Sequence, residues 1–272
     1  MRRDNSNSSR RPKSQEIVRQ IYRRLAKRWG AQHWWPADTP FEVITGAILT
    51  QNTSWKNVER ALANLRGANV LRVDGIRRLG MEELQQLIRC SGYYRQKSER
   101  LKNFVSFLDA KHNGSLDAMF AKSTEELRAE LLTQKGIGPE TADAILLYAG
   151  QHEVFVVDAY TNRVLQRHEA IAPGAKYEAV RALVESALRD EAIQKEGHKD
   201  SVTCPPVHQR TTMSLAIRSQ RAAVYNEMHG LLVQVGKRYC YKVEPKCDEC
   251  PLGAMLGRAA RRRLASESPS TR

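Results

Sequence analysis

The sequence lacks any apolar segment of the length that a membrane-spanning helix needs, since no run of about 18 apolar residues occurs in it. Its first 15 residues, Met1–Gln15, are basic and rich in Ser and Asn, and they have no apolar core of the kind found in a secretory signal. We therefore expect a disordered basic arm over residues 1–15 and a cytoplasmic protein without a membrane partner.

Acidic residues are also in short supply. The chain of 272 residues has 30 acidic and 44 basic side chains, which gives a formal net charge of +14. Such an excess favours a polyanionic partner, because each phosphate that a protein neutralises releases condensed counterions. The charge balance therefore indicates a polyanion-binding protein rather than a merely solvated surface.

Cysteine is scarce and unevenly placed. There are five cysteines, an odd number, and three of them lie close together near the C-terminus. This arrangement fits metal binding in a reducing cytoplasm better than a disulfide framework. Cys90 stands in a helical context and is predicted to be a core residue.

No alternating pattern of the strand type is present, and apolar residues recur instead at helical spacing. Ile17, Ile21 and Leu25 form one such stripe, and similar stripes follow along the chain. Glycines and polar residues separate the stripes, as expected at helix ends. The sequence predicts an all-α fold with about ten or more helices.

Residues 190–222 interrupt the helical pattern. They are polar and contain Gly197 and the pair Pro205-Pro206, so we predict an inserted, largely disordered loop. Helical spacing then returns, and residues 257–272 are predicted to be a basic flexible tail.

The most informative stretch lies between residues 131 and 158. Gly136-Ile137-Gly138 separates two apolar, helix-patterned segments, and Pro139 suits the first position of a new helix. Glycines let backbone N–H groups come close to a ligand, and the free N–H groups of a helix start favour an anion. An anion held by backbone alone carries no base identity, so this turn can grip a nucleic-acid phosphate without reading sequence.

This turn, with Asp158 twenty positions after Gly138, resembles the helix-hairpin-helix of the endonuclease III-like DNA glycosylases, the HhH-GPD superfamily. The resemblance runs from roughly Ile17 to Met255, apart from the insertion. It implies two helical lobes with double-stranded DNA lying across the cleft between them, and we expect a monomer.

The resemblance also implies how the chain is divided. A continuous lobe of six helices that carries the hairpin is expected over residues 40–155. The other lobe is expected to join residues 16–39 to residues 156–256, with a cysteine loop at 240–256.

Asp158 matches the family's catalytic aspartate. It follows the apolar run at 154–157 and precedes a helix-patterned segment, so its structural alternative is a helix N-cap. The two roles are compatible, because capping and the helix dipole keep a carboxylate ionised. A fixed carboxylate facing DNA can stabilise the oxocarbenium-like sugar that forms as a base departs and can orient the attacking water.

The family members that also cleave the DNA backbone carry a lysine two residues after the second hairpin glycine. Here that position is Glu140, and a carboxylate cannot form an imine with the sugar. Lys135 precedes the glycines and more plausibly faces the phosphate. The departure predicts a monofunctional glycosylase with water as nucleophile.

The resemblance places Gln51 where the family inserts a polar side chain into the gap left by a flipped nucleotide. Such a wedge would offset part of the few kcal/mol that flipping costs, although a plain turn between two helices is the structural alternative. The residues expected to contact DNA are thus Gln51, Lys135, Gly136, Ile137, Gly138 and Thr141.

All four tryptophans lie between residues 29 and 55. Trp34, Trp35, Pro36 and Trp55 are predicted to form a stacking pocket for an extruded base, since flat electron-rich rings bind a cationic, alkylated purine well. The Trp-Trp-Pro-Ala stretch before Thr-Gln-Asn-Thr-Ser-Trp looks like the 3-methyladenine glycosylase branch of the superfamily. The alternative is that one or two of these rings fill the core, which we prefer for the helical Trp29.

Cys240, Cys247 and Cys250 match the first three ligands of the family's C-terminal [4Fe–4S] loop, but Leu256 stands where the fourth is expected. Three possibilities follow: a cluster with a non-cysteine ligand, a cluster completed by Cys204 from the insertion, or a relic loop without a cluster.

Three functions are compatible with these features. The first is a base-excision DNA glycosylase for alkylated purines, and the second is a glycosylase for oxidised pyrimidines or mismatched bases. The third is a non-enzymatic DNA-binding protein, which needs neither a wedge nor a carboxylate that phosphate repels. Glu140 and the tryptophans favour the first.

Overall fold

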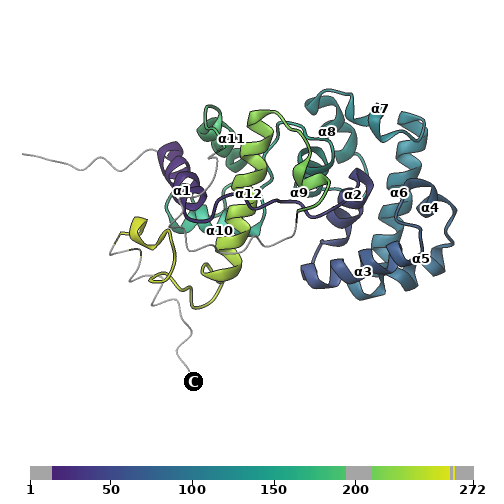
Figure 1. The fold of residues 1–272 in the computed structure, drawn as a ribbon, viewed down its shortest axis with the longest axis horizontal. Helices are drawn as coiled ribbons and strands as arrows, with labels where there is room; N and C mark the ends of the chain where they lie inside the picture. Colours follow the sequence, from purple (N-terminus) through teal and green to yellow (C-terminus); the bar gives the residue numbers. More distant parts are fainter. Residues whose placement is uncertain (1–13, 194–209, 258–259, 261–272) are drawn as a thin grey trace, which may run out of the picture.

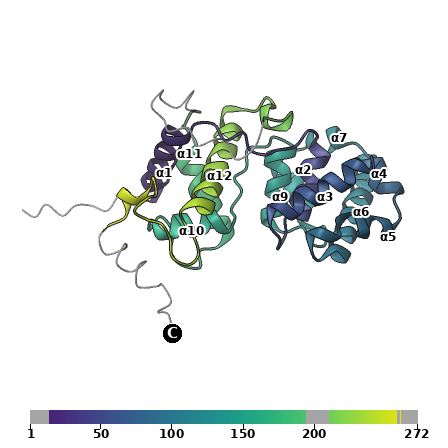
Figure 2. The same cartoon turned by 60° about the horizontal axis from the view of Figure 1, so that its bottom comes forward.

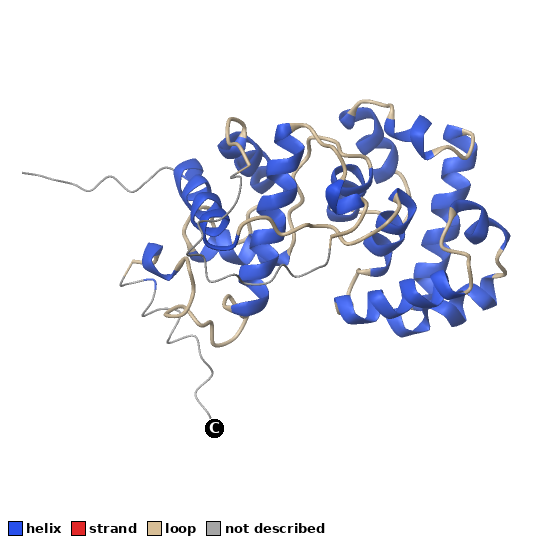
Figure 3. Cartoon of the chain, viewed as in Figure 1, coloured by secondary structure: helices blue, strands red, loops and turns tan. Residues whose placement is uncertain are grey.

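The computed structural model describes residues 14–193, 210–257 and 260 (Figure 1). These residues form helices and no strand (Figure 3), which confirms the predicted all-α fold. The α-helices of the described ranges are α1 Ser14–Trp29, α2 Pro40–Leu49, α3 Trp55–Gly67, α4 Val73–Arg78, α5 Met81–Ile88, α6 Tyr94–His112, α7 Leu116–Phe120, α8 Thr124–Leu132, α9 Pro139–Ala144, α10 Ala159–Arg167, α11 Tyr177–Leu188 and α12 Gln220–Arg238. Shorter turns are η1 Arg89–Ser91, η2 Ile145–Ala149, η3 Met213–Leu215 and η4 Gly253–Met255.

The helices form two groups, which both views separate (Figures 1 and 2). One group contains α1, α10, α11 and α12, in which α1 packs on α11 and α12, and α10 packs on α12. The other contains α2 to α9, with α6 in contact with α2, α4, α5 and α7. The predicted two-lobed architecture is therefore present. None of the described helices combines the length and apolar character that crossing a bilayer requires.

The group α2 to α9 has eight helices, more than the six expected for residues 40–155, and three of the eight are very short. Helices α4 and α9 have six residues each, and α7 has five. Helix α6 ends at Asn113 and Gly114, whose φ angles of 52° and 73° lie in the left-handed region that stops an α-helix. The chain is thus broken into short segments that wrap around α6.

A buried lysine fixes the end of α2. Lys97 of α6 is 1% exposed, and its Nζ donates hydrogen bonds to the carbonyl oxygens of Leu49 at 2.8 Å and Ser91 at 2.7 Å. Burial, together with the charge of Arg100, lowers the pKa of Lys97 to about 8. Because a buried carbonyl without a donor is costly, this contact sets where α2 stops and the Gln51 turn starts.

A buried ion pair ties the hairpin to the other group of helices. Asp143 of α9 is fully buried and accepts a hydrogen bond from Arg128 of α8 at 2.6 Å and another from the Tyr177 hydroxyl of α11 at 2.8 Å. Burial raises the pKa of Asp143, and Arg128 opposes that effect. Arg128 also donates to Glu178 of α11 at 2.6 Å. Since losing one partner of a buried pair is strongly destabilising, this network holds the hairpin against α11.

Two segment boundaries differ from those predicted. Helix α1 begins at Ser14, so the expected arm overlaps the helix by two residues, and residues 1–13 lie outside the described part. Helix α12 begins at Gln220, inside the predicted insertion. Of the predicted tail, the structure describes Gly257 and Ala260.

The end of the insertion is structured because it packs on the loop that holds the predicted base pocket. The amide of Met213 donates to the carbonyl of Ala37 at 3.0 Å, and the Thr211 hydroxyl accepts from the Ala37 amide at 3.1 Å. Met213 is buried. One apolar anchor and two hydrogen bonds thus order a polar segment in which no helical pattern is visible.

Candidate active site

Asp158 caps the N-terminus of α10. The buried run Val154–Val157 leads into it, and its Oδ1 accepts a hydrogen bond from the Thr161 amide at 2.7 Å. The capping role expected of this residue is therefore present. Only 13% of the side chain is exposed, so the carboxylate is held in place and still reaches solvent.

His229 of α12 is the second partner of this carboxylate. Its Nε2 lies 3.6 Å from Asp158 Oδ2, and its Nδ1 is 2.7 Å from the hydroxyl of Tyr148, which lies in η2. Burial by itself would raise the pKa of Asp158, but His229 and the Thr161 amide outweigh burial and bring the pKa below its usual value. The site therefore keeps an ionised carboxylate at neutral pH.

The three tryptophans predicted to form a pocket contact one another and this carboxylate network. The Trp34 ring centroid is 5.8 Å from that of His229 and 5.8 Å from that of Trp35. The Trp35 ring stands edge-on to Trp55 at 5.0 Å and is 5.1 Å from Tyr148. These rings, which come from four separate segments, thus form one aromatic group that reaches Asp158 through His229.

These rings differ in how much surface they offer. Trp34 and Trp35 are 6% and 5% exposed and belong to the hydrophobic core. A Cβ added at Gly46 would lie 3.2 Å from the Trp35 ring, so this ring packs directly on the backbone of α2. Trp55 is only partly buried, and its Nε1 donates to Glu59 at 2.8 Å. Pro36 is partly buried as well.

Two charged groups complete the surroundings of Asp158. Lys237 of α12 places its Nζ 6.0 Å from the centre of the Trp34 ring, and burial lowers the pKa of Lys237 although Glu59 and Asp158 raise it. Glu140 is exposed to solvent. Desolvation by the surrounding protein, together with the charge of Asp158, nevertheless raises the pKa of Glu140 to about 7. A second full negative charge beside Asp158 is therefore disfavoured.

The hairpin has the backbone geometry that a phosphate site requires. Gly136 has φ of +87°, which favours glycine. Gly138 is extended and caps α9, with Pro139 at the first helical position as predicted. Ile137 is buried and anchors the turn, whereas Lys135 is exposed. The amides at the start of α9 consequently have no side chain of residue 138 in front of them.

Gln51 is bound to the hairpin itself. Its Nε2 donates to the carbonyl of Gly136 at 3.0 Å and to the hydroxyl of Thr141 at 2.9 Å. Its Oε1 accepts from Arg100, whose side chain fills the space where a Cβ of residue 136 would lie. The structure therefore joins the Gln51 turn and the hairpin into one unit, with Thr141 buried at the junction.

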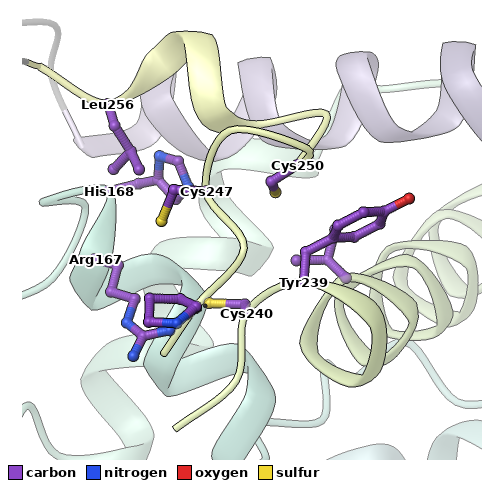
Figure 4. A pocket seen from close by; sticks show the side chains of 9 residues that line it. Arg167, His168, Tyr239, Cys240, Cys247, Cys250 and Leu256 are labelled. Atoms are coloured by element: carbon purple, nitrogen blue, oxygen red, sulfur yellow. Dashed lines mark hydrogen bonds between the residues drawn. The ribbon is translucent and has the colours of Figure 1, made fainter. Parts of the chain in front are cut away.

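The three C-terminal cysteines line one small cavity together with His168 and Leu256 (Figure 4). In residues 14–193 and 210–257, no three histidine, cysteine, aspartate or glutamate side chains are gathered so as to hold a metal ion. The donor set nevertheless fits an iron–sulfur cluster in kind, because thiolates and imidazoles are its ligands. Cys204 lies outside the described residues.

Three residues of the site were not found from the sequence: Tyr148, His229 and Lys237. Each lies within a helical turn whose neighbours are mostly apolar core residues. A histidine or tyrosine at such a position is normally interpreted as a core residue. The partners of these side chains become visible only when α12 packs against η2 and α10.

Comparison with known proteins agrees with this geometry. Residues 45–190 match the HhH-GPD superfamily of base excision DNA repair proteins. A Methanocaldococcus jannaschii protein named "Putative DNA repair glycosylase" is 39% identical over 87% of this chain and 94% of its own length. Endonuclease III of Thermotoga maritima is 24% identical over 86% of this chain and 89% of its own length.

Solved structures give the same result. The 3-methyladenine DNA glycosylase of H. pylori, determined with 1,N6-ethenoadenine bound, superposes with a TM-score of 0.65 and 28% identity, over 84% of this chain and 98% of that one. An endonuclease III trapped on DNA superposes with a TM-score of 0.68 over 92% of this chain and 98% of that one; at 19% identity, this likeness concerns the fold.

The two hairpin glycines should respond differently to substitution. Nothing lies within 4 Å of a Cβ at Gly138, so Gly138→Ala should fold normally and weaken binding to any duplex, damaged or not. At Gly136, the positive φ and the nearby Arg100 should make Gly136→Ala lower the melting temperature. Thermal unfolding beside titration of undamaged and lesion-bearing duplexes checks both. A binding loss in Gly138→Ala confined to damaged DNA would contradict a sequence-independent phosphate grip.

Proposed function

Since the chain belongs to the HhH-GPD superfamily of base excision DNA repair proteins, we propose that it hydrolyses the N-glycosidic bond of alkylated purines in double-stranded DNA. The observation that carries this proposal is the ionised Asp158, held between the α10 amides and His229 and next to a group of tryptophans. A binding protein has no need of such a carboxylate near a phosphate.

Asp158 acts on the sugar of the extruded nucleotide. As the bond between C1′ and the base nitrogen breaks, its electron pair leaves with the base and positive charge develops on the sugar. The Asp158 carboxylate stabilises that charge and orients a water molecule, whose oxygen bonds to C1′ and whose proton is released. An alkylated, cationic purine departs as a neutral base, so this reaction requires little help from a general acid.

Trp34, Trp35, Pro36 and Trp55 form the proposed base pocket. The face of Trp34 already carries Lys237, so we place the base against Trp55, which has the more accessible ring. The H. pylori relative, whose solved complex holds a modified adenine, supports a purine substrate.

Contact with the DNA backbone is assigned to the hairpin. The free amides at the start of α9 favour a phosphate, and the net charge of +14 supports a polyanionic partner. Lys135 is exposed beside the turn and adds a charge there. Gln51, tied to Gly136 and Thr141, is proposed to enter the gap left by the flipped nucleotide once DNA replaces those contacts.

The proposed reaction uses water and leaves the DNA backbone intact. Glu140 stands where an imine-forming lysine would be needed, and its raised pKa of about 7 makes it a weak charge near neutrality rather than a nucleophile. The amine of Lys237 is the alternative nucleophile near Asp158, because burial lowers its pKa.

Cys240, Cys247 and Cys250 would hold the [4Fe–4S] cluster that the resemblance implies. When bound, such a cluster cross-links the segments that ligate it and so contributes to folding. No step of base release is assigned to it.

A product-identified release assay tests the proposed function. On duplexes carrying methylated purines, oxidised pyrimidines, or uracil and thymine mismatches, the wild type should release the methylated purines. Asp158→Asn should abolish release and leave DNA binding intact or tighter, since a charge that phosphate repels is removed. If only oxidised pyrimidines were released, the substrate class would be oxidised pyrimidines and not alkylated purines. Near-normal turnover by Asp158→Asn would overturn the catalytic role of Asp158.

Borohydride trapping on lesion DNA tests whether water is the nucleophile. We expect no covalent capture of the wild type and weak capture of Glu140→Lys, which restores an amine beside Asp158. The variant Lys237→Ala is the matched control. Efficient capture of the wild type that disappears in Lys237→Ala would show that Lys237 forms an imine and that the enzyme is bifunctional.

Substitution of the tryptophans distinguishes a role in the base pocket from a role in the hydrophobic core. Stacking contributes about 1–3 kcal/mol per base, so Trp55→Ala should slow excision of a methylated purine by roughly 5- to 150-fold with a small change in melting temperature. Trp35→Ala should also lose about 3–5 kcal/mol of stability, because its ring is buried against Tyr148. Excision rate is measured beside thermal midpoint. If excision falls only in proportion to lost folding, these rings belong to the core alone.

A further inference from the structure

We propose that His168 is the fourth ligand of the cluster and takes the place of the cysteine that Leu256 replaces. His168 directly follows α10 as its C-terminal cap residue. Its ring lines the same cavity as Cys240, Cys247 and Cys250 (Figure 4). His168 is distant in sequence from the cysteine loop, and no spacing rule connects the two.

The imidazole of His168 has an unused coordinating atom. Its Nδ1 is buried and has no hydrogen-bond partner among the described residues. A buried polar atom without a partner is uncommon and costs free energy, so it calls for an explanation such as a bound ion. Nδ1 of a neutral histidine is a normal metal ligand, and the His168 side chain lines a cavity that three cysteines share.

Leu256 cannot fill the fourth position. Its side chain is apolar and packs against Cys247 and Ala260. The turn before it is tightly wound: the amide of Gly253 donates to the carbonyl of Cys250 at 2.8 Å, and a Cβ at Gly253 would lie 2.1 Å from the carbonyl oxygen of Cys247. This turn places Cys247 and Cys250 at the same cavity. Because Leu256 has no ligating atom, the fourth ligand has to come from another segment of the chain.

Helix α10 already contacts the cysteine loop through the two arginines near its C-terminal end. Arg167 donates to the sulfur of Cys240 at 3.1 Å and to the carbonyl of Tyr241 at 2.7 Å, and Arg163 donates to the carbonyl of Cys240 at 2.6 Å. Hydrogen bonds to the sulfurs of a cluster tune its properties. These bonds bring His168, the next residue, to the cavity.

Three thiolates and one histidine can also bind a single zinc ion in tetrahedral geometry. We assign an iron–sulfur cluster because the spacing of Cys240, Cys247 and Cys250 matches the first three ligands of a cluster loop. Zinc is therefore a distinct outcome of the experiment.

The experiment measures iron, acid-labile sulfide and zinc per chain in the full-length protein purified without oxygen, together with the electron paramagnetic resonance spectrum. The wild type should hold about four irons and four sulfides. Cys247→Ala should lose them. His168→Ala should lose at least one iron of the four and show an altered spectrum. The double variant His168→Ala with Leu256→Cys should regain the full content, because a cysteine then occupies the fourth position.

A matched control comes from His152, whose Nε2 is also buried without a partner but which lies outside the cysteine cavity. His152→Ala should leave iron and sulfide unchanged. One zinc per chain without sulfide, or no metal in the wild type, would overturn the cluster. Unchanged iron in His168→Ala would overturn its role as ligand, as would a folded double variant that regains no iron. None of these readouts depends on base release.

Discussion

The proposed active site depends on keeping one carboxylate ionised in a largely buried position. Burial and an approaching phosphate both favour the protonated form of Asp158. The Thr161 amide and His229 counteract that tendency, and Tyr148 fixes the other nitrogen of the imidazole. These partners come from α10, α12 and η2, so the three elements must pack together before the carboxylate can function.

The hairpin is held in place by two separate sets of polar contacts. Lys97 fixes the end of α2, and Gln51 then ties the following turn to Gly136. On the other side, Asp143 and its buried partners hold α9 against α11. Apolar packing alone tolerates small shifts between helices, whereas these directional bonds do not. The position of the hairpin relative to Asp158 is therefore set by hydrogen bonds.

The features that could be predicted from the sequence are those encoded by neighbouring residues. Helical periodicity predicts the all-α fold. Pro139 marks the start of α9, and Asp158 marks the position just before α10. The features that could not be predicted depend on contacts between distant segments. The partnership of Asp158 with His229, the burial of Trp34 and Trp35, and the ordering of residues 210–219 by Ala37 arise from tertiary packing, which a local pattern does not contain.

Helix α10 connects the proposed active site to the cysteine loop. Its N-terminus carries Asp158, and its C-terminus carries Arg167 and His168, about 15 Å away along the helix axis. Val164 and Leu165 are buried on one face of α10 and so fix the rotation of the helix about its own axis. Apolar contacts resist a shift along that axis only weakly. Polar anchors at both ends remove that freedom. The cysteine loop can thus affect the proposed base release without taking part in it, because a helix held at its far end also holds the carboxylate at its near end.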